Sequence, residues 1–482
     1  MVPANSLSDL ALGLFSSNRY LWGMTAQIRP VHRDMPMLLP PDLRDWVPED
    51  DIVHFVIEAV ERMPWTPDSF AINLRGSGSK QYSPRMMLAL LVYCYANGIF
   101  SSRRIERATY RDVGVRYLTG DTHPDHDTIC EFRRRNQKAF AEAFLHVLKL
   151  ARELGVLKVG TVSVDGTHLD ANASKSKNVR YDRAVELERQ LRLDIDDLLR
   201  KAEAADADET ADGQSLPEEI SRRERLLEKM QEAQANLKAR AEAKAAAERE
   251  KYQRKIEEDE ARRQGEPRRG PRPQPPENKG PEPTDQANLT DDDSRLMRKN
   301  HRAEYRQAYN AQAVVDAEGS QLILAEHVTN CANDVNPLEA AVQGVDPTVG
   351  KPSAVLADSG YVNGDALERL ERDGYDLYVP VTAEEGNSER RYDFRPPREK
   401  KPRAITDPRL VAMQTKMQGK EARRRYAKRK QTVEPVFGII KSVMGFRNFR
   451  LRGLARVSLE WTLTTLAYNV KRLHALRSQA AS

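Results

Sequence analysis

The sequence predicts an α/β protein with a mixed sheet and flanking helices, preceded by an all-helical N-terminal region and interrupted by an inserted helical hairpin. Three patterns support this prediction. Residues 24–150 contain apolar runs with helical spacing, and from Lys158 onward short β-rich runs are separated by helical segments. Between the first two β-rich runs lies a long charged stretch, residues 176–299. Strands in series, followed by strands that alternate with helices, favour a mixed sheet covered by helices.

Five β-rich runs make up the predicted sheet. In chain order they are VGTVSVDGTHLDA, AYNAQAVVDAEG, QLILAEHVTN, SAVLADSGY and DLYVPVT. Between the last two runs, GDALERLERDG has the spacing of a helix that ends at Gly374. The sheet region therefore comprises residues 151–175 and 300–482.

The N-terminal region is predicted to be a helical domain over residues 24–150, preceded by a poorly structured extension, residues 1–23. Its apolar run MMLALLVYCYA fits a buried helix, and the helix after HPDHDT ends in three consecutive arginines. Arg133, Arg134 and Arg135 in a helix-turn-helix would face a DNA groove. The alternative is a helical bundle with a solvated basic edge, and the spacing leaves both interpretations open.

The inserted stretch has two parts. Residues 176–261 carry apolar residues at helical and heptad spacing, which predicts two helices paired as a hairpin. These residues are Leu187, Leu191, Ile195 and Leu198, then Ile220, Leu227, Met230 and Leu237. Residues 262–299 begin with seven prolines within residues 262–283, a composition that buries too little apolar surface to order itself. We expect this second part to be a flexible return to the sheet.

Charge is distributed unevenly along the chain. Residues 401–482 carry 19 Lys and Arg against 4 Asp and Glu, a net charge of +15 in a chain whose total is +5. A basic segment on a mildly acidic body indicates a polyanionic partner, with DNA or RNA ahead of a membrane surface. The longest apolar run, Met86–Ala96, is too short to cross a bilayer, and the three cysteines form no CxxC pair. We expect a cytoplasmic protein without a disulfide framework.

Two aspartates directly follow apolar strand residues and are candidates for chemistry. Asp165 follows TVSV, and Asp358 follows SAVLA. A carboxylate at the end of a buried strand is costly unless it is paired, hydrogen-bonded or bound to a metal. Gly, Ser or Thr follow each Asp within two positions, so the chain can turn and leave the carboxylate at the sheet edge. Taken alone, an aspartate at such a position is more often a turn or helix cap than a catalytic residue. Asp316, in VVDAEG, fits a hairpin turn better.

Glu434 is a third candidate, because it is the only acid between Lys428 and Arg456. An isolated acid among bases usually forms only an ion pair. Pro435 disfavours a helical residue before it, which places Glu434 at a helix start or a kink. Lys441 lies seven residues later, about two turns along and on nearly the same helical face.

Three such carboxylates suit hard divalent cations such as Mg²⁺, which take oxygen ligands. Two ions about 4 Å apart can activate the attacking oxygen and stabilise the leaving oxygen in an in-line displacement at phosphorus. Basic residues around Glu434 would then bind the phosphates of DNA.

At these residues the sequence resembles the DDE transposases of bacterial insertion sequences, in the branch with a helical insertion after the first catalytic Asp. The resemblance runs from about Met24 to the end of the final helix. Its motifs are RPVHRDMPMLLPPDLRDWVPEDD, PDHDTICEFRRRN, VSVDGTHLDANASK, AYNAQAVVDAEGSQLILAEHVTNCANDV, LADSGY and QTVEPVFGIIK.

The resemblance implies an RNase H-like catalytic domain, residues 151–175 and 300–482, that cleaves DNA and transfers strands at the ends of an insertion sequence. It implies Asp165, Asp358 and Glu434 as the catalytic and metal-binding triad, with two Mg²⁺ ions that Mn²⁺ can replace. Double-stranded DNA is the implied partner, as terminal inverted repeats and as target. We expect a homodimer on this DNA, because two ends are held at once, and association with the nucleoid.

Related branches of the family show a Tyr, an Arg, the Glu and a Lys at set intervals. Glu434 and Lys441 keep the last interval, whereas Lys430 occupies the place of the arginine and Tyr426 and Arg429 lie one residue early. We expect DNA contacts from this segment, at Arg423, Arg424, Arg425, Tyr426, Lys428, Arg429, Lys430 and Lys441. Two alternatives stay open: a nuclease of the same fold that does not transpose, and a DNA-binding architectural or repressor protein without catalysis.

Overall fold

The computed structural model describes residues 42–72, 81–206, 216–263, 274–298, 303–331, 337–382 and 405–481. By its internal contacts the chain divides into residues 1–46 and residues 47–482. In the first unit the described residues contain a short 3-10 helix, Leu43–Trp46, and all that follows concerns the second unit. The expected N-terminal extension, residues 1–23, and the start of the resemblance at Met24 lie outside the described residues.

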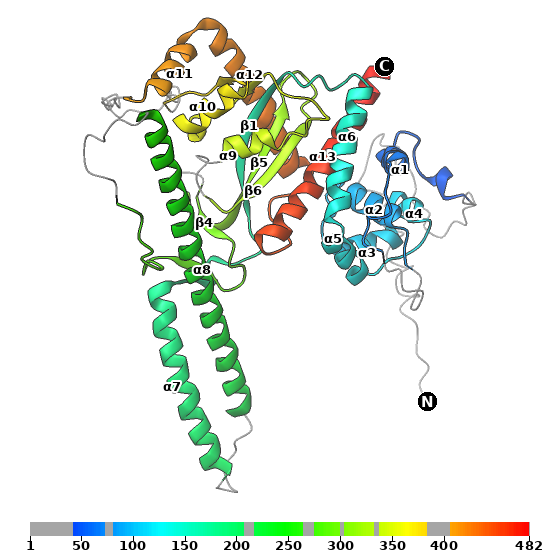
Figure 1. Ribbon diagram of the computed structural model, residues 1–482. Helices are drawn as coiled ribbons and strands as arrows, with labels where there is room; N and C mark the ends of the chain where they lie inside the picture. Colours follow the sequence, from blue (N-terminus) through cyan, green and yellow to red (C-terminus); the bar gives the residue numbers. More distant parts are fainter. Residues whose placement is uncertain are drawn as a thin grey trace, which may run out of the picture. The chain divides into compact units, whose positions relative to one another are not determined.

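Among the described residues a mixed sheet of six strands carries the candidate aspartates (Figure 1). Its strands are β1 (Thr161–Asp170), β4 (Arg295–Met297), β5 (Arg306–Asp316), β6 (Ile323–Thr329), β7 (Ala354–Leu356) and β8 (Asp376–Tyr378). One edge of β5 pairs antiparallel with β1, and its other edge pairs antiparallel with β4 and then β6. β7 and β8 continue the sheet from β1 in parallel. The five predicted strands and the mixed sheet are therefore confirmed.

Helices cover the strands, which explains why the strands have continuous apolar runs. Every residue of β5 after Arg306 is buried, as is the whole of β7. The helices packed on the sheet are α9 (Pro337–Gln343), α10 (Gly364–Arg372), α12 (Lys420–Gly438) and α13 (Leu454–Ala481). α10 begins at its cap Asn363 and ends before Gly374, whose φ is +87°, so the predicted stop of this helix is confirmed.

The described residues before β1 are mostly helical. The helices are α1 (Ile52–Arg62), α2 (Pro84–Ala96), α3 (Ser102–Arg111), α4 (Val113–Thr119), α5 (His126–Arg135) and α6 (Gln137–Glu153). α2 contains the longest apolar run and is buried from Met87 to Ala96, as predicted, while α2 and α6 both pack on α13. No helix in the described part of the chain has the length and apolar character needed to span a membrane.

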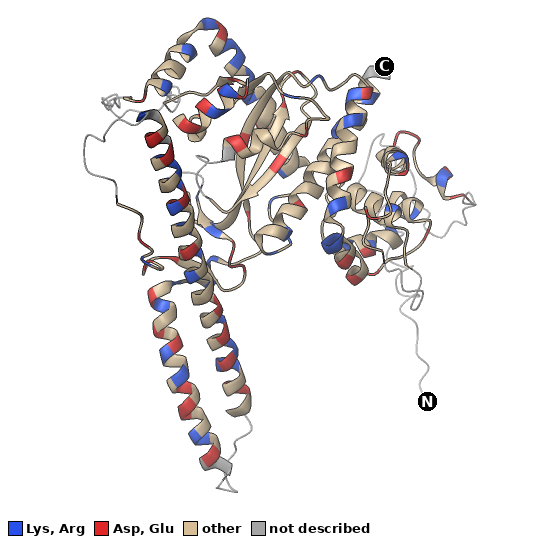
Figure 2. Cartoon of the chain, viewed as in Figure 1, with Lys and Arg blue, Asp and Glu red and all other residues tan. Residues whose placement is uncertain are grey.

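The insertion is a helical hairpin whose base is a small two-stranded sheet (Figure 1). β2 (Asn178–Arg180) leads into α7 (Tyr181–Asp206), and after α8 (Leu216–Arg263) the chain reaches β3 (Gln286–Asn288), which pairs antiparallel with β2. The predicted apolar seam is confirmed, because Leu191, Met230 and Leu237 are buried in one cluster between the helices. Both helices carry acidic and basic residues along their length (Figure 2), so the surface of the hairpin has mixed charge.

The return from the hairpin differs from the flexible segment that we expect over residues 262–299. β3 and β4 lie within residues 286–297, and β4 joins the main sheet. The backbone N–H of Tyr181 donates to the carbonyl of Asp285 at 2.8 Å, so the return already contacts the start of α7 there. This part of the prediction is wrong, because three-residue strands show too little alternation to be distinguished from a loop.

Candidate active site

Asp165 and Asp358 occupy corresponding positions on two neighbouring parallel strands. In the register of β1 and β7, Ser163 is the partner of Leu356. Asp165 lies two residues beyond Ser163, and Asp358, whose backbone is still extended, lies two residues beyond Leu356. Paired strands run about 4.8 Å apart, and side chains two residues apart point to the same face. The register therefore places the two carboxylates side by side.

Each aspartate also accepts a hydrogen bond from its own segment. Asp165 Oδ1 accepts from the backbone N–H of Gly166 at 2.8 Å. Asp358 Oδ1 accepts from the N–H of Gly360 at 2.8 Å and caps the 3-10 turn Ser359–Tyr361. Because these bonds use Oδ1, the Oδ2 atom of each aspartate can interact with other parts of the protein or with a ligand.

Gly166 serves a purpose other than the turn that we expect after Asp165. β1 does not end at Asp165 but continues to Asp170. A Cβ on Gly166 would collide with the side chains of Gln312 and Asn310, which are buried on β5. The glycine therefore allows β1 to pack closely against polar side chains of β5, which would have to move to accommodate any larger residue.

A buried guanidinium lies against the aspartate pair. Arg429 of α12 donates from Nη1 to Asp165 Oδ2 at 2.9 Å, and the two side chains are only 9% and 17% exposed. Burial lowers the pKa of Arg429, but the charges of Asp165, Tyr426 and Asp358 outweigh this effect and raise it overall. Arg429 and the buried Tyr426 are therefore not the surface DNA contacts that the sequence predicts. Arg429 is a counter-ion of the aspartates.

Glu434 is an exposed residue in the interior of α12, not at a helix start. The helix tolerates Pro435, which has no N–H for the carbonyl of Gln431. Instead, Gln321 Nε2 donates to this carbonyl at 3.0 Å. The irregularity comes later, as a π-helical turn over Ile439–Val443. Of the two predicted positions, a helix start or a kink, the helix start is wrong, because the helix continues through Pro435 and the side chain of Gln321 satisfies the carbonyl that the proline leaves open.

Lys441 connects the end of this helix to β1. Its Nζ donates to Thr167 Oγ1 at 2.5 Å and to the carbonyl of His168 at 3.0 Å. Thr167 lies two residues after Asp165 and so on the same face of β1. The regular spacing that would put Glu434 and Lys441 on one helical face does not hold here, because the π-helical turn Ile439–Val443 begins between them. Glu434 is exposed, whereas its neighbours Val433 and Val436 are buried.

The fit of these residues to a metal ion is partial. Asp165 and Asp358 suit a hard divalent cation, because they are adjacent oxygen donors whose like charges call for a cation. However, no group of three or more His, Cys, Asp or Glu side chains among the described residues is placed to hold a metal. Glu434 is thus not gathered with the aspartates, and Arg429 lies beside Asp165 instead.

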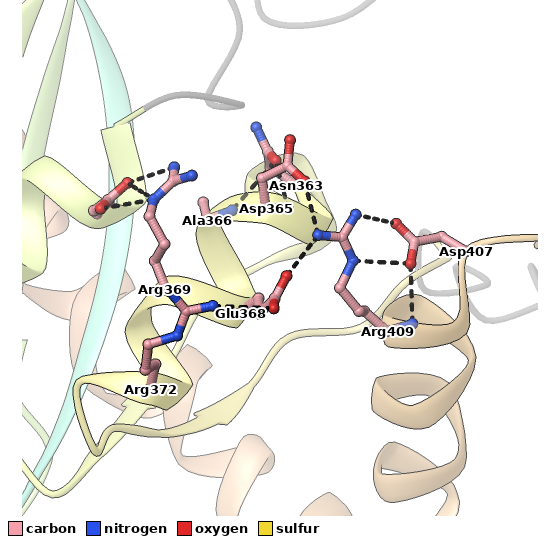
Figure 3. Close-up of polar contacts among 9 residues, drawn as sticks. Asn363, Asp365, Ala366, Glu368, Arg369, Arg372, Asp407 and Arg409 are labelled. Carbon is pink, nitrogen blue, oxygen red and sulfur yellow. Dashed lines mark hydrogen bonds and ion pairs between the residues drawn. The ribbon is translucent and has the colours of Figure 1, made fainter. Parts of the chain in front are cut away.

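An ionic network fixes the start of the segment that carries Arg429 and Glu434 (Figure 3). Arg409, in α11 (Pro408–Gln418), donates to Asp365 at 2.7 Å and to Glu368 at 2.9 Å, both on α10. It also pairs with Asp407, the cap of its own helix, at 2.8 Å. Because α12 follows α11 after a single glycine, these contacts help to position α12 over the sheet.

Asp316 has the turn role that the sequence predicts for it. It ends β5, and Oδ2 accepts hydrogen bonds from Ser320 N at 3.1 Å and Ser320 Oγ at 2.7 Å. Burial raises the pKa of Asp316, although the bonds from Ser320 act against this rise. Its carboxylate stabilises the β5–β6 turn.

The three arginines at the end of α5 have different environments. Arg133 is 3% exposed and donates from Nη1 to the Tyr95 hydroxyl at 2.9 Å and the Phe100 carbonyl at 3.2 Å. The predicted DNA contact is therefore wrong for Arg133, because its charge is used inside the protein. Arg134 and Arg135 are exposed and pair with Glu131 at 2.9 and 3.4 Å.

The other basic candidates lie on the exposed side of α12. They are Arg423, Arg424, Arg425, Lys428 and Lys430. Arg425 pairs with Glu421 at 3.2 Å and lies 3.5 Å from Asp376. Lys428 lies 3.8 Å from Glu318. Their exposure leaves them accessible to a phosphate backbone.

A second basic surface, on α3, is absent from the sequence predictions. One side of this helix is buried through Ile105, Ala108 and Thr109. The opposite side carries exposed residues at helical spacing: Arg103, Arg104, Arg107, Tyr110 and Arg111. We name this the α3 basic face. The basic residues of SRRIERATYR recur at helical spacing, which predicts a basic helix face. The three consecutive arginines of α5 form the more conspicuous basic cluster in this region.

Two family comparisons match the chain. Residues 279–470 match the family described as Transposase DDE domain, and residues 41–135 match the family described as Transposase domain (DUF772). The first match includes Asp358, Glu434 and Lys441 but not Asp165, which precedes the insertion. The second includes α3 and its basic face. No curated protein and no solved structure matches the chain.

Proposed function

Because the chain belongs to the DDE transposases of insertion-sequence type, we propose that Asp165, Asp358 and Glu434 form its catalytic site. The register of β1 and β7, which sets the two aspartates side by side, is the observation that carries this proposal. Glu434 is an exposed residue of α12, the helix that also carries Arg429, and Lys441, seven residues further along, contacts β1. The mixed sheet is compatible with the RNase H-like fold that the DDE domain implies.

The proposed reaction is cleavage at each end of the element, followed by strand transfer. Water displaces the 3′ oxygen at the terminal phosphodiester, so one P–O bond forms as another breaks. The freed 3′-hydroxyl then displaces an oxygen at a phosphodiester of the target DNA in the same way. Asp165, Asp358 and Glu434 would hold two Mg²⁺ ions, for which Mn²⁺ substitutes, and such ions neutralise charge at phosphorus and acidify the attacking group.

The protein itself supplies positions and charge, which account for most of the catalysis in phosphoryl transfer. Lys441 Nζ is fixed by Thr167 and His168, next to the strand that carries Asp165. A scissile phosphate held at Asp165 would lie within reach of this ammonium group. Lys441 would therefore orient the phosphate.

We also infer that the α3 basic face and the exposed basic residues of α12 contact the DNA backbone. Both surfaces present several exposed cations, and phosphate contacts of this kind supply affinity without sequence specificity. The two ends of an element have to be held together during strand transfer, which favours a homodimer on DNA.

The test is incubation of the purified protein with DNA that carries its terminal inverted repeats and a target plasmid, in Mg²⁺, Mn²⁺ or EDTA. We expect cuts at the repeat ends and joined products with either metal and none in EDTA. Cleavage without joined products would favour a nuclease of the same fold. Binding without cleavage in both metals would contradict catalysis altogether.

A further inference from the structure

Arg429 lies directly against Asp165, one of the two aspartates at which the proposed function places a metal ion. Its Nη1 is 2.9 Å from Asp165 Oδ2, and the charge of Asp358 also acts on the guanidinium. The side chain is almost fully buried between its own helix, α12, and the strands β1 and β7 on which this helix packs. A cation of the protein thus lies where the proposed function requires a cation from solution.

The fit of the guanidinium is incomplete. Arg429 Nε is buried and has no hydrogen-bond partner among the described residues. A buried donor without an acceptor costs about 1–3 kcal/mol. Packing alone does not explain such a residue, because an apolar side chain would fill the same space without this cost. The compensation comes from the two aspartates, whose mutual repulsion an adjacent positive charge relieves.

We propose that Arg429 is an internal counter-ion that occupies the aspartate pair in the metal-free protein and competes with divalent cations for it. This inference rests on the proposed function, because it assumes that Asp165 and Asp358 bind the metal. Binding of the metal then releases the guanidinium from Asp165. A released guanidinium beside the site is suited to pair with an incoming phosphate, through two parallel hydrogen bonds.

The test compares Arg429→Gln and Arg429→Lys with the wild type, using Mn²⁺ as the probe. Arg424→Gln, which removes an exposed arginine of the same helix, is the matched control. Mn²⁺ affinity is measured by calorimetry, and the melting temperature is measured in EDTA and in saturating Mn²⁺. Neither measurement requires DNA or catalytic activity.

For Arg429→Gln we expect a lower melting temperature in EDTA and its recovery in Mn²⁺. Its Mn²⁺ affinity is expected to rise at least about tenfold, since an adjacent arginine lowers the proton affinity of a carboxylate by about one to three orders of magnitude and its positive charge repels a metal cation in the same way. Arg429→Lys, which keeps the charge on a shorter and simpler group, is expected to lie between the two. Should Arg429→Gln fail to fold, the Mn²⁺ affinity and melting temperature of Arg429→Lys still test whether the guanidinium competes with the metal. Arg424→Gln is expected to match the wild type in melting temperature and in Mn²⁺ affinity, the two quantities measured here without DNA.

A melting temperature that falls equally in EDTA and Mn²⁺, with no gain in Mn²⁺ affinity, would overturn the inference and leave Arg429 a structural residue. Asp165→Asn separates this failure from failure of the proposed function. If Asp165→Asn abolishes Mn²⁺ binding while Arg429→Gln leaves it unchanged, only the counter-ion inference fails. If the wild type and Arg429→Gln both bind no Mn²⁺, the metal site itself is wrong.

Discussion

A buried polar network joins α2 and α5 to α13, and its disruption should have a large and measurable cost. Glu460 and Tyr95 are 0% exposed, and Arg133 is 3% exposed. The Tyr95 hydroxyl receives a hydrogen bond from Arg133 Nη1 at 2.9 Å and donates to Glu460 Oε1 at 3.2 Å. Glu460 Oε2 accepts from the backbone N–H groups of Arg450 and Leu451, at 2.8 and 3.0 Å.

Glu460→Gln removes the negative charge of this network while nearly keeping the size of the side chain. Burial raises the pKa of Glu460, while the charge of Arg133 and the hydrogen bonds from Leu451, Arg450 and Tyr95 lower it. At a pH at which Glu460 is ionised, the substitution leaves Arg133 a buried cation without the anion that faces it through the Tyr95 hydroxyl, and removing one partner of a buried charge pair costs up to about 3–5 kcal/mol. We therefore expect the free energy of unfolding to fall by about this amount. Arg133→Met in the same molecule should restore part of it, because no unpaired charge then stays buried.

Urea denaturation followed by circular dichroism measures the loss. Arg134→Gln, at the exposed neighbour of Arg133, is the control and is expected to change stability by about 0.5 kcal/mol or less. Two results would refute the reasoning. One is a Glu460→Gln variant as stable as the wild type. The other is an Arg133→Gln variant that keeps its stability but loses affinity for DNA.

Three further predictions concern other parts of the molecule. Burial raises the pKa of Glu326 from 4.5 to about 7, against the opposing hydrogen bond from Thr462. Because the folded protein holds the proton of Glu326 more tightly than the unfolded chain does, the free energy of unfolding is greatest below about pH 4.5. It falls by up to about 3 kcal/mol in total as the pH rises through 7. Glu326→Gln should flatten this part of a stability–pH curve. Replacing Arg104 and Arg107 of the α3 basic face with Gln should weaken binding to all DNA sequences, as measured by fluorescence anisotropy. The slope of log affinity against log salt concentration should become shallower by roughly one per lost phosphate contact. A changed sequence preference with an unchanged slope would contradict this. Replacing residues 264–281 with a Gly/Ser linker should leave cleavage in the repeat-end assay largely intact, and loss of folding would show that this segment packs on the rest of the protein.

Long and strongly periodic elements were predictable from the sequence, whereas short ones were not. The apolar run of α2 and the heptads of α7 and α8 indicate their own burial, because the signal repeats over several turns. β2, β3 and β4 have three residues each and exist because a partner strand pairs with them. The sequence of such a short segment does not indicate which strand it pairs with.

The candidate site shows the same division. Apolar strand residues before Asp165 and Asp358 identify both aspartates locally, and their adjacency follows from strand register. Arg429 and Asp165 are 264 positions apart in the sequence, so no local sequence pattern predicts their contact. Arg133 likewise has the appearance of a surface charge in a run of three arginines. Its burial depends on Tyr95 and, through Tyr95, on Glu460, which lies 365 residues further along the chain from Tyr95.

The central claim, that Asp165, Asp358 and Glu434 carry the chemistry, is tested most directly by cleavage of repeat-end DNA in Mg²⁺. We expect Asp165→Asn, Asp358→Asn and Glu434→Gln each to lower cleavage by several orders of magnitude while binding to the same DNA persists, because metal ligands and DNA-contacting cations are separate residues. Asp170→Asn, at a half-buried aspartate of β1 that pairs with Arg306 at 3.0 Å, should cut at a near-normal rate. A triad variant that cuts as fast as Asp170→Asn would contradict the assignment.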